Sequence, residues 1–119
     1  MITPECIQKL RNVYKAIGSF ETGMQRSVGL NLNEAMLLCS LSDKGGMTAG
    51  EVGDCLGLTQ SNASKVIRSL EKKKLLKRTL DKADKRVMHF QLTKAGEAKL
   101  EGMDCQNMTL PPLLENCVV

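Results

Sequence analysis

The 119-residue sequence contains few of the residues that catalytic, metal and membrane sites require. It has no tryptophan and one histidine, His89, and its five cysteines are irregularly spaced with no Cys-x-x-Cys pair. This pattern argues against both a disulfide framework and a structural zinc site. No apolar run approaches the roughly 20 residues of a membrane span, and Met1-Ile2-Thr3-Pro4-Glu5 lacks the basic and apolar parts of a signal peptide. We therefore expect a cytoplasmic protein without a metal or cofactor.

Groupings typical of enzymes are also missing from the sequence. There is no Ser/His/Asp or Cys/His arrangement, no pair of carboxylates suited to acid–base work, and no glycine-rich phosphate loop. The length suits one domain, and 42% apolar with 25% charged residues is ordinary for a globular protein. These features predict a single non-enzymatic domain over residues 1–119.

Positive charge is concentrated in one segment. Residues 59–86 contain ten Lys or Arg and three acidic residues, a net charge of +7, whereas the remainder carries seven basic and ten acidic residues, or −3. A basic segment on a mildly acidic body favours a polyanionic partner.

The basic segment opens with an amphipathic helix that Thr59 is predicted to cap. A shorter helix precedes it, opened by the capping box of Thr48 and Glu51 and stopped at Gly57. Two helices joined by a tight glycine turn, the second with a basic face, are typical of a helix-turn-helix. The apolar side of the second helix has Ala63, Val66, Ile67 and Leu70, and the opposite side has Ser61, Lys65, Arg68 and Lys72.

A period of two residues follows the second helix. Residues 77–80 and 87–92 are predicted to pair as antiparallel strands around a charged tip at residues 81–85, and Thr93 is predicted to cap a further helix. His89 is expected to be an exposed strand residue and not a metal ligand. The sequence thus predicts a mainly α fold with a small β-wing, a winged helix-turn-helix.

Helices are expected on both sides of this arrangement. Residues 3–29 form a long amphipathic pattern with Thr3 as cap and Pro4 as first residue. We predict that residues 3–29 and 94–119 are dimerisation helices around a DNA-binding core at residues 33–92, with the wing near 77–92 and Asn33 capping the core's first helix. Ordinary packing within one chain is the alternative for the long apolar face. Pro111-Pro112 interrupts the last helix.

Three motifs resemble those of the MarR family of winged helix-turn-helix transcriptional regulators. The first is the recognition-helix entry Leu56-Gly57-Leu58-Thr59-Gln60-Ser61, continuing to Lys65. The second runs from Leu70 to Arg78, where the family usually has glycine at the position of Lys74. The third is Asp81-Lys82-Ala83-Asp84-Lys85-Arg86, followed by Leu92-Thr93-Lys94-Ala95-Gly96. The resemblance covers roughly residues 32–100.

The resemblance and the charge pattern together imply a DNA-binding surface. A helix fits the major groove with its N-terminal residues nearest the bases, and in the family the arginine matching Arg86 enters the minor groove. Asp84 is expected to orient that arginine, with Arg86 or Arg78 as its partner; the alternative is a surface ion pair that contributes little. Lys72 and Lys73 lie further along the helix and are expected to contact only the DNA backbone, and for Lys72 to Lys74 a solvated helix end is the alternative. The predicted DNA-binding residues are Gln60, Ser61, Asn62, Ser64, Lys65, Arg68, Lys85 and Arg86.

The resemblance further implies a homodimer that binds a pseudo-palindromic operator in double-stranded DNA and acts as a repressor. Some family members sense oxidants through a thiol of the first helix, which makes Cys6 a candidate redox sensor. Others bind small aromatic acids, but only three aromatic residues are present, so no effector pocket is outlined. The alternative is a winged-helix module that binds protein and not DNA, although the basic face has no aromatic anchor.

Overall fold

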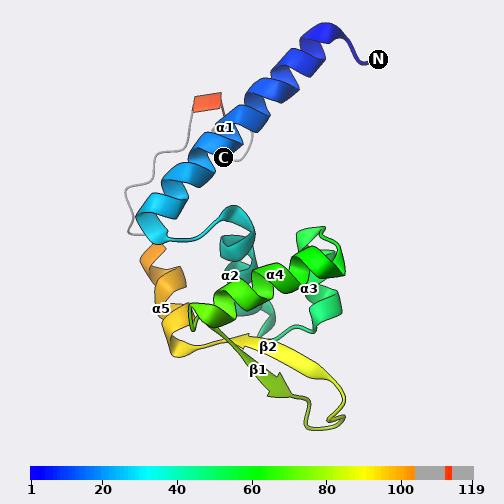
Figure 1. The fold of residues 1–119 in the computed structure, drawn as a ribbon, viewed down its shortest axis with the longest axis vertical. Coiled ribbons are helices and arrows are strands. Elements are labelled where there is room, and N and C mark those ends of the chain that lie inside the picture. Colours follow the sequence, from blue (N-terminus) through cyan, green and yellow to red (C-terminus); the bar gives the residue numbers. More distant parts are fainter. Residues whose placement is uncertain (104–111, 114–119) are drawn as a thin grey trace. The chain divides into compact units, whose positions relative to one another are not determined.

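The computed structural model describes residues 1–103 and 112–113, and its helices and strands follow the predicted order (Figure 1). The chain divides into two compact units, the first of which contains Met1–Asn31, while the second begins at Leu32 and contains the elements from α2 to α5. This boundary lies one residue from the predicted start of the core. The predicted continuation of the C-terminal helix beyond Met103, with its interruption at Pro111, lies outside the described residues.

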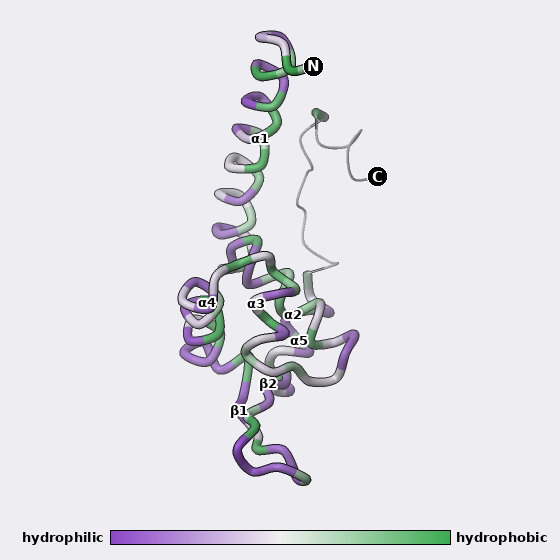
Figure 2. The backbone as a smooth tube through the Cα atoms, turned by 90° about the vertical axis from the view of Figure 1, so that its right-hand side faces the viewer, coloured by the Kyte–Doolittle hydropathy of each residue, from purple (hydrophilic) through white to green (hydrophobic). Residues whose placement is uncertain are grey.

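The first unit contains the long helix α1, Pro4–Val28. As predicted, Pro4 occupies its first turn and the Thr3 hydroxyl caps it, accepting a hydrogen bond from the Cys6 backbone N–H at 3.2 Å. Gly29 ends the helix in the left-handed conformation, with φ of 72°. Hydrophobic and hydrophilic residues alternate along α1 (Figure 2). Much of its apolar face is exposed within this single chain, at Ile7, Leu10, Tyr14 and Ile17.

The second unit begins with α2 (Leu32–Lys44) and α3 (Ala49–Leu56), followed by α4 (Gln60–Lys72). The cap predicted at Asn33 is wrong, because the tight turn at Gly29 allows α2 to begin at Leu32. The unit's core is built from apolar side chains of these helices and of the sheet, each almost inaccessible to solvent. They include Leu37, Leu38, Leu41, Met47, Val52, Ile67, Leu70 and Phe90.

The wing consists of β1 (Leu76–Leu80) and β2 (Met88–Leu92). The strands pair antiparallel from Leu76 opposite Leu92 to Leu80 opposite Met88, and their tip extends away from the helices α2 to α5 of the same unit (Figure 1). Phe90 also exchanges two backbone hydrogen bonds with Met47, which attaches the wing to the segment before α3. The fold is therefore a winged helix-turn-helix, as predicted. None of the helices among the described residues is both long and apolar enough to cross a membrane.

The helix α5, Lys94–Met103, directly follows Thr93, and the Thr93 side chain links the start of α5 to the turn after α4. The Thr93 hydroxyl accepts a hydrogen bond from the Gly96 backbone N–H at 3.0 Å and donates one to the Lys74 carbonyl at 2.8 Å. Gly96 packs so closely on the Leu75 carbonyl that a Cβ at this position would overlap with it. The predicted cap at Thr93 is confirmed, and the glycine of the Leu-Thr-x-x-Gly motif is explained by this close backbone approach.

Lys74, which follows the end of α4, has a φ of 63° and is the one non-glycine residue with positive φ among those described. The left-handed conformation costs a residue with a Cβ about 1–2 kcal/mol, which accounts for the glycine usual in the family at this position.

We expect Lys74→Gly to raise the free energy of unfolding by about 0.5 to 1 kcal/mol, because the relieved strain exceeds the extra entropy of glycine in the unfolded chain. Denaturant unfolding would measure this gain. Lys72→Gly is the matched control, since Lys72 lies within α4, and it should lower stability. A Lys74→Gly protein less stable than the parent would contradict the strain argument.

Candidate nucleic-acid interface

The recognition helix α4 is held to α3 by a short turn. Gly57 ends α3 with φ of 66°, and the Leu58 backbone N–H donates to the Gly53 carbonyl at 3.0 Å. Thr59 then caps α4 by accepting from the Asn62 N–H at 3.2 Å. The capping box of Thr48 and Glu51, which opens α3, is also present. The predicted helix-turn-helix is confirmed.

Burial within α4 follows the predicted division into two sides. Ala63, Val66, Ile67 and Leu70 are buried, whereas Ser61, Asn62, Lys65 and Arg68 are exposed. Ser64 is half-buried. The Gln60 side chain is exposed, but its amide lies against Gly53 in α3, where it occupies the space that a Cβ would need. Of the six predicted positions on α4, four therefore present a fully available side chain to a ligand.

A buried carboxylate anchors the C-terminal end of α4. Glu34, on α2, has a side chain only 2% exposed, and its Oε2 accepts hydrogen bonds from Ser69 Oγ and Lys73 Nζ, both at 2.7 Å. The sequence predicted that Lys73 contacts the DNA backbone or lies at a solvated helix end. Neither prediction includes its hydrogen bond to Glu34. A glutamate near the apolar side of a predicted helix was the available signal, but its partners are 35 and 39 residues away.

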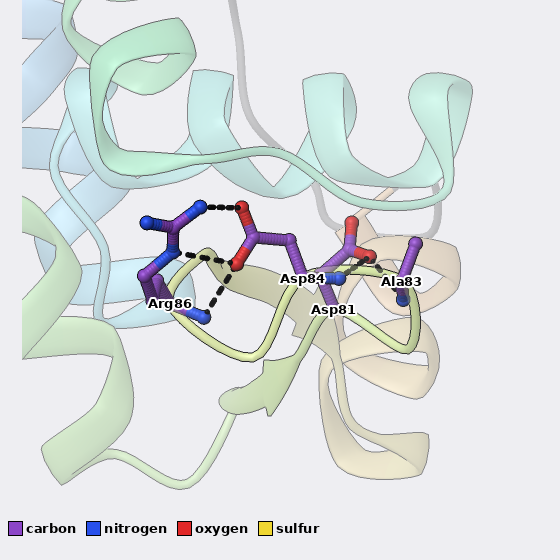
Figure 3. A network of polar contacts seen from close by, with 4 residues as sticks. All are labelled: Asp81, Ala83, Asp84 and Arg86. Carbon is purple, nitrogen blue, oxygen red and sulfur yellow. Dashed lines mark hydrogen bonds and ion pairs between the residues drawn. The ribbon is translucent and has the colours of Figure 1, made fainter.

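The wing tip is organised by two aspartates (Figure 3). Asp84 Oδ1 accepts hydrogen bonds from the Arg86 backbone N–H at 3.0 Å and from its Nε at 3.1 Å, and Oδ2 accepts from Nη2 at 3.3 Å. The Arg86 side chain and backbone hold the pKa of the Asp84 carboxyl below its usual value, so this carboxyl is ionised at neutral pH. Arg86 is thus held at its guanidinium while its side chain stays 91% exposed.

Arg78 has a different role from the one that the sequence left open for it. The structure selects Arg86 as the partner of Asp84, and Arg78 instead binds Glu71 at the end of α4, with Nε–Oε2 and Nη2–Oε1 distances of 2.6 and 2.9 Å. These hydrogen bonds raise the pKa of Arg78 above its usual value. Its guanidinium also lies 5.6 Å from the centroid of the Phe90 ring. Arg78 therefore fixes the base of the wing to the recognition helix.

The remaining wing residues separate into exposed and half-buried groups. Lys85 is exposed at the tip, as a phosphate contact would require. His89, expected as an exposed strand residue, is half-buried instead, because Asp81 at the start of the tip folds back over it; the distance from His89 Nε2 to Asp81 Oδ2 is 2.9 Å. The register could have indicated this pair, since His89 lies opposite Thr79 and Asp81 is the diagonal neighbour on the same face.

Cys6, the candidate redox sensor, is exposed in the first turn of α1. The Thr3 hydroxyl donates a hydrogen bond to its Sγ at 3.2 Å, and this bond, with a further contribution from the Thr3 backbone, lowers the pKa of the thiol. Across the described ranges, no three His, Cys, Asp or Glu side chains gather into a set that could hold a metal ion.

The sequence was compared with protein families and with known proteins, and both comparisons found relatives. A family model described as the MarR family matches residues 28–87. An uncharacterised helix-turn-helix-type transcriptional regulator of Bacillus subtilis, YwaE, is 25% identical over 101 residues, which are 82% of this chain and 59% of that protein. The chain thus spans about three fifths of the length of this relative.

Solved structures share the fold. The structure of Bordetella bronchiseptica BpsR, whose DNA binding is regulated by 6-hydroxynicotinic acid, is 29% identical, with a TM-score of 0.71 over 90% of this chain and 71% of BpsR. A MepR-like protein complexed with pseudoligands is 25% identical, with a TM-score of 0.78 over 91% of this chain and 77% of that one.

Proposed function

Since the chain belongs to the MarR family, we propose that it is a transcriptional regulator that binds a specific double-stranded DNA sequence as a homodimer and represses the genes that follow it. One observation carries the proposal: the recognition helix exposes Ser61, Asn62, Lys65 and Arg68, and the same unit holds Arg86 exposed at the end of a wing. Both lie in the segment with a net charge of +7.

In this proposal the two elements bind different grooves. Ser61, Asn62 and Lys65, near the N-terminal end of α4, contact base edges in the major groove, while Arg68 contacts a base or a phosphate. Arg86 enters the minor groove, where narrow A·T segments concentrate negative potential, and Lys85 contacts phosphate beside it. The protein therefore distinguishes sequences by direct contacts in one groove and by groove shape in the other.

The dimer is proposed from the exposed apolar face of α1. Two copies would bury Ile7, Leu10, Tyr14 and Ile17 against one another, and a two-fold dimer reads a pseudo-palindrome with half-sites about 10 base pairs apart. Release by a small molecule or by oxidation of Cys6 is part of the same proposal; the DNA binding of the similar protein BpsR is regulated by a small molecule, 6-hydroxynicotinic acid.

Binding to duplex DNA from the region upstream of the gene, titrated with salt and repeated with peroxide, tests the proposal. Affinity should fall steeply with salt, because each neutralised phosphate releases counterions. Affinity that is indifferent to salt, or capture of a protein partner without DNA, would instead support the protein-binding alternative. Loss of affinity in peroxide that Cys6→Ser prevents would support the thiol as the signal.

Lys65→Ala should lower discrimination between the operator and unrelated DNA by about tenfold, because a base-edge contact contributes about 1–3 kcal/mol of specificity. Lys72→Ala is the matched control, because it removes the same charge from the same helix at a position that is expected to contact only the DNA backbone. It should weaken both duplexes equally and reduce the salt slope by about one. Equal effects of the two substitutions on discrimination would contradict the assignment of Lys65.

A further inference from the structure

The wing tip contains a continuous chain of hydrogen bonds that begins on strand β2 and ends at Arg86. His89 lies at its start and contacts Asp81 Oδ2 through Nε2. An ionised carboxylate only accepts hydrogen bonds, so Nε2 is the donor in this contact. The imidazole is fixed in the paired strand, 29% exposed, and is the most protected member of the chain.

Asp81 transmits this attachment to the backbone of the tip. Its Oδ1 accepts hydrogen bonds from the backbone N–H groups of Ala83, at 2.7 Å, and Asp84, at 3.0 Å (Figure 3). The Asp81 backbone N–H donates to the Val87 carbonyl at 2.9 Å, which closes the loop. Both carboxylate oxygens of Asp81 are therefore engaged, one with the strand and one with the residue that holds Arg86.

The hydrogen bonds also act on the charge of Asp81. The backbone N–H of Asp84, then the His89 imidazole, then the N–H of Ala83 lower the pKa of this carboxyl. Asp81 therefore stays ionised at neutral pH and remains an acceptor for all three donors. Exposure of the side chains rises along the chain, from 29% for His89 and 31% for Asp81 to 42% for Asp84 and 91% for Arg86.

We propose that His89 is a positioning residue for Arg86: it fixes Asp81, Asp81 fixes the backbone that carries Asp84, and Asp84 holds the guanidinium in the direction of the minor groove. The inference rests on the proposed function, because Arg86 needs a fixed direction only if it binds DNA. Without the His89 contact, the tip keeps its charges but samples more conformations, so part of the binding free energy is lost in ordering it.

The test is a double-mutant cycle between His89 and Arg86, read as affinity for an operator with A·T-rich flanks. His89→Leu should weaken binding about fivefold in the parent protein and leave the affinity of the Arg86→Ala protein unchanged, because residues acting through one network are not additive. His89→Gln keeps a side-chain N–H donor and should restore most of the affinity lost in His89→Leu. Gln91→Leu is the matched control on the same face of β2, and it should bind as the parent does.

Each outcome separates the inference from the proposed function. Equal fivefold losses from His89→Leu with and without Arg86, or no rescue by His89→Gln, would overturn the positioning role while leaving DNA binding intact. An Arg86→Ala protein that binds as tightly as the parent would instead overturn the proposed minor-groove contact. Thermal unfolding of every variant identifies a loss of folding, and the His89→Gln rescue distinguishes positioning from a general effect on stability.

Discussion

A protein carrying Ile7→Glu and Leu10→Glu together is expected to be a folded monomer that binds a palindromic operator at least about a hundredfold more weakly than the parent, since linked binding of two sites contributes factors of about 10²–10⁴. Both side chains are exposed on the apolar face of α1 in the single chain, Ile7 at 57% and Leu10 at 66%. Glutamates there face water in a monomer, but in the proposed dimer they would be buried without partners.

Sedimentation equilibrium and operator binding would measure the two effects on one preparation. The matched control is Asn12→Glu with Ser19→Glu, which changes the charge equally on the opposite, exposed side of α1 and should leave the dimer and its affinity intact. A double variant of Ile7 and Leu10 that remains dimeric would place the dimer interface elsewhere. One that is monomeric with full affinity would exclude cooperative binding by two subunits.

Arg86→Ala should weaken operator binding by about tenfold to a hundredfold, or roughly 1.4–2.8 kcal/mol, because it removes a minor-groove cation. It also leaves the Asp84 carboxylate without the guanidinium that neutralises it, so a negative charge is presented to the DNA backbone. The loss should be concentrated on operators with A·T-rich flanks. When the flanks are changed to G·C, the parent should lose affinity and the Arg86→Ala protein should change little.

Lys82→Ala is the control for this experiment, because Lys82 is exposed on the same tip and carries the same charge. Its effect should stay within about threefold, as expected for one more distant phosphate neighbour. Equal losses from Lys82→Ala and Arg86→Ala, with the same dependence on the flanks, would show that the wing contributes only general electrostatic attraction.

Local signals in the sequence were sufficient for most of the fold. Helix caps and the change of period at the wing depend on residues within a few positions of one another. They could therefore be predicted without knowing the tertiary contacts, as the caps at Thr3, Thr48, Thr59 and Thr93 were. The left-handed backbone of Lys74 was not predicted, although the family's usual glycine at this position was a local signal for it.

The contacts that hold the candidate site in place could not be predicted in the same way. Glu34 and Lys73 are 39 residues apart, and each resembles an ordinary helical surface residue until packing brings them together. His89 and Asp81 are separated by eight residues, but their contact depends on the strand register and on how the tip folds back. The partner of Asp84 was left open between Arg86 and Arg78 for a similar reason, because the sequence does not show that Arg78 lies beside Glu71.

The Glu34 anchor has a consequence for signalling. Leaving the buried Glu34 carboxylate without its hydrogen bonds from Ser69 and Lys73 costs several kcal/mol. We therefore expect α2 and α4 to move as one rigid body, so that the recognition helix keeps its orientation on α2. A signal that contributes the roughly 1–3 kcal/mol typical of allosteric coupling is too small to rearrange the DNA-binding side of α4. We expect it to change the separation of the two recognition helices in a dimer, and an induced protein should then favour operators with altered half-site spacing over those with altered bases.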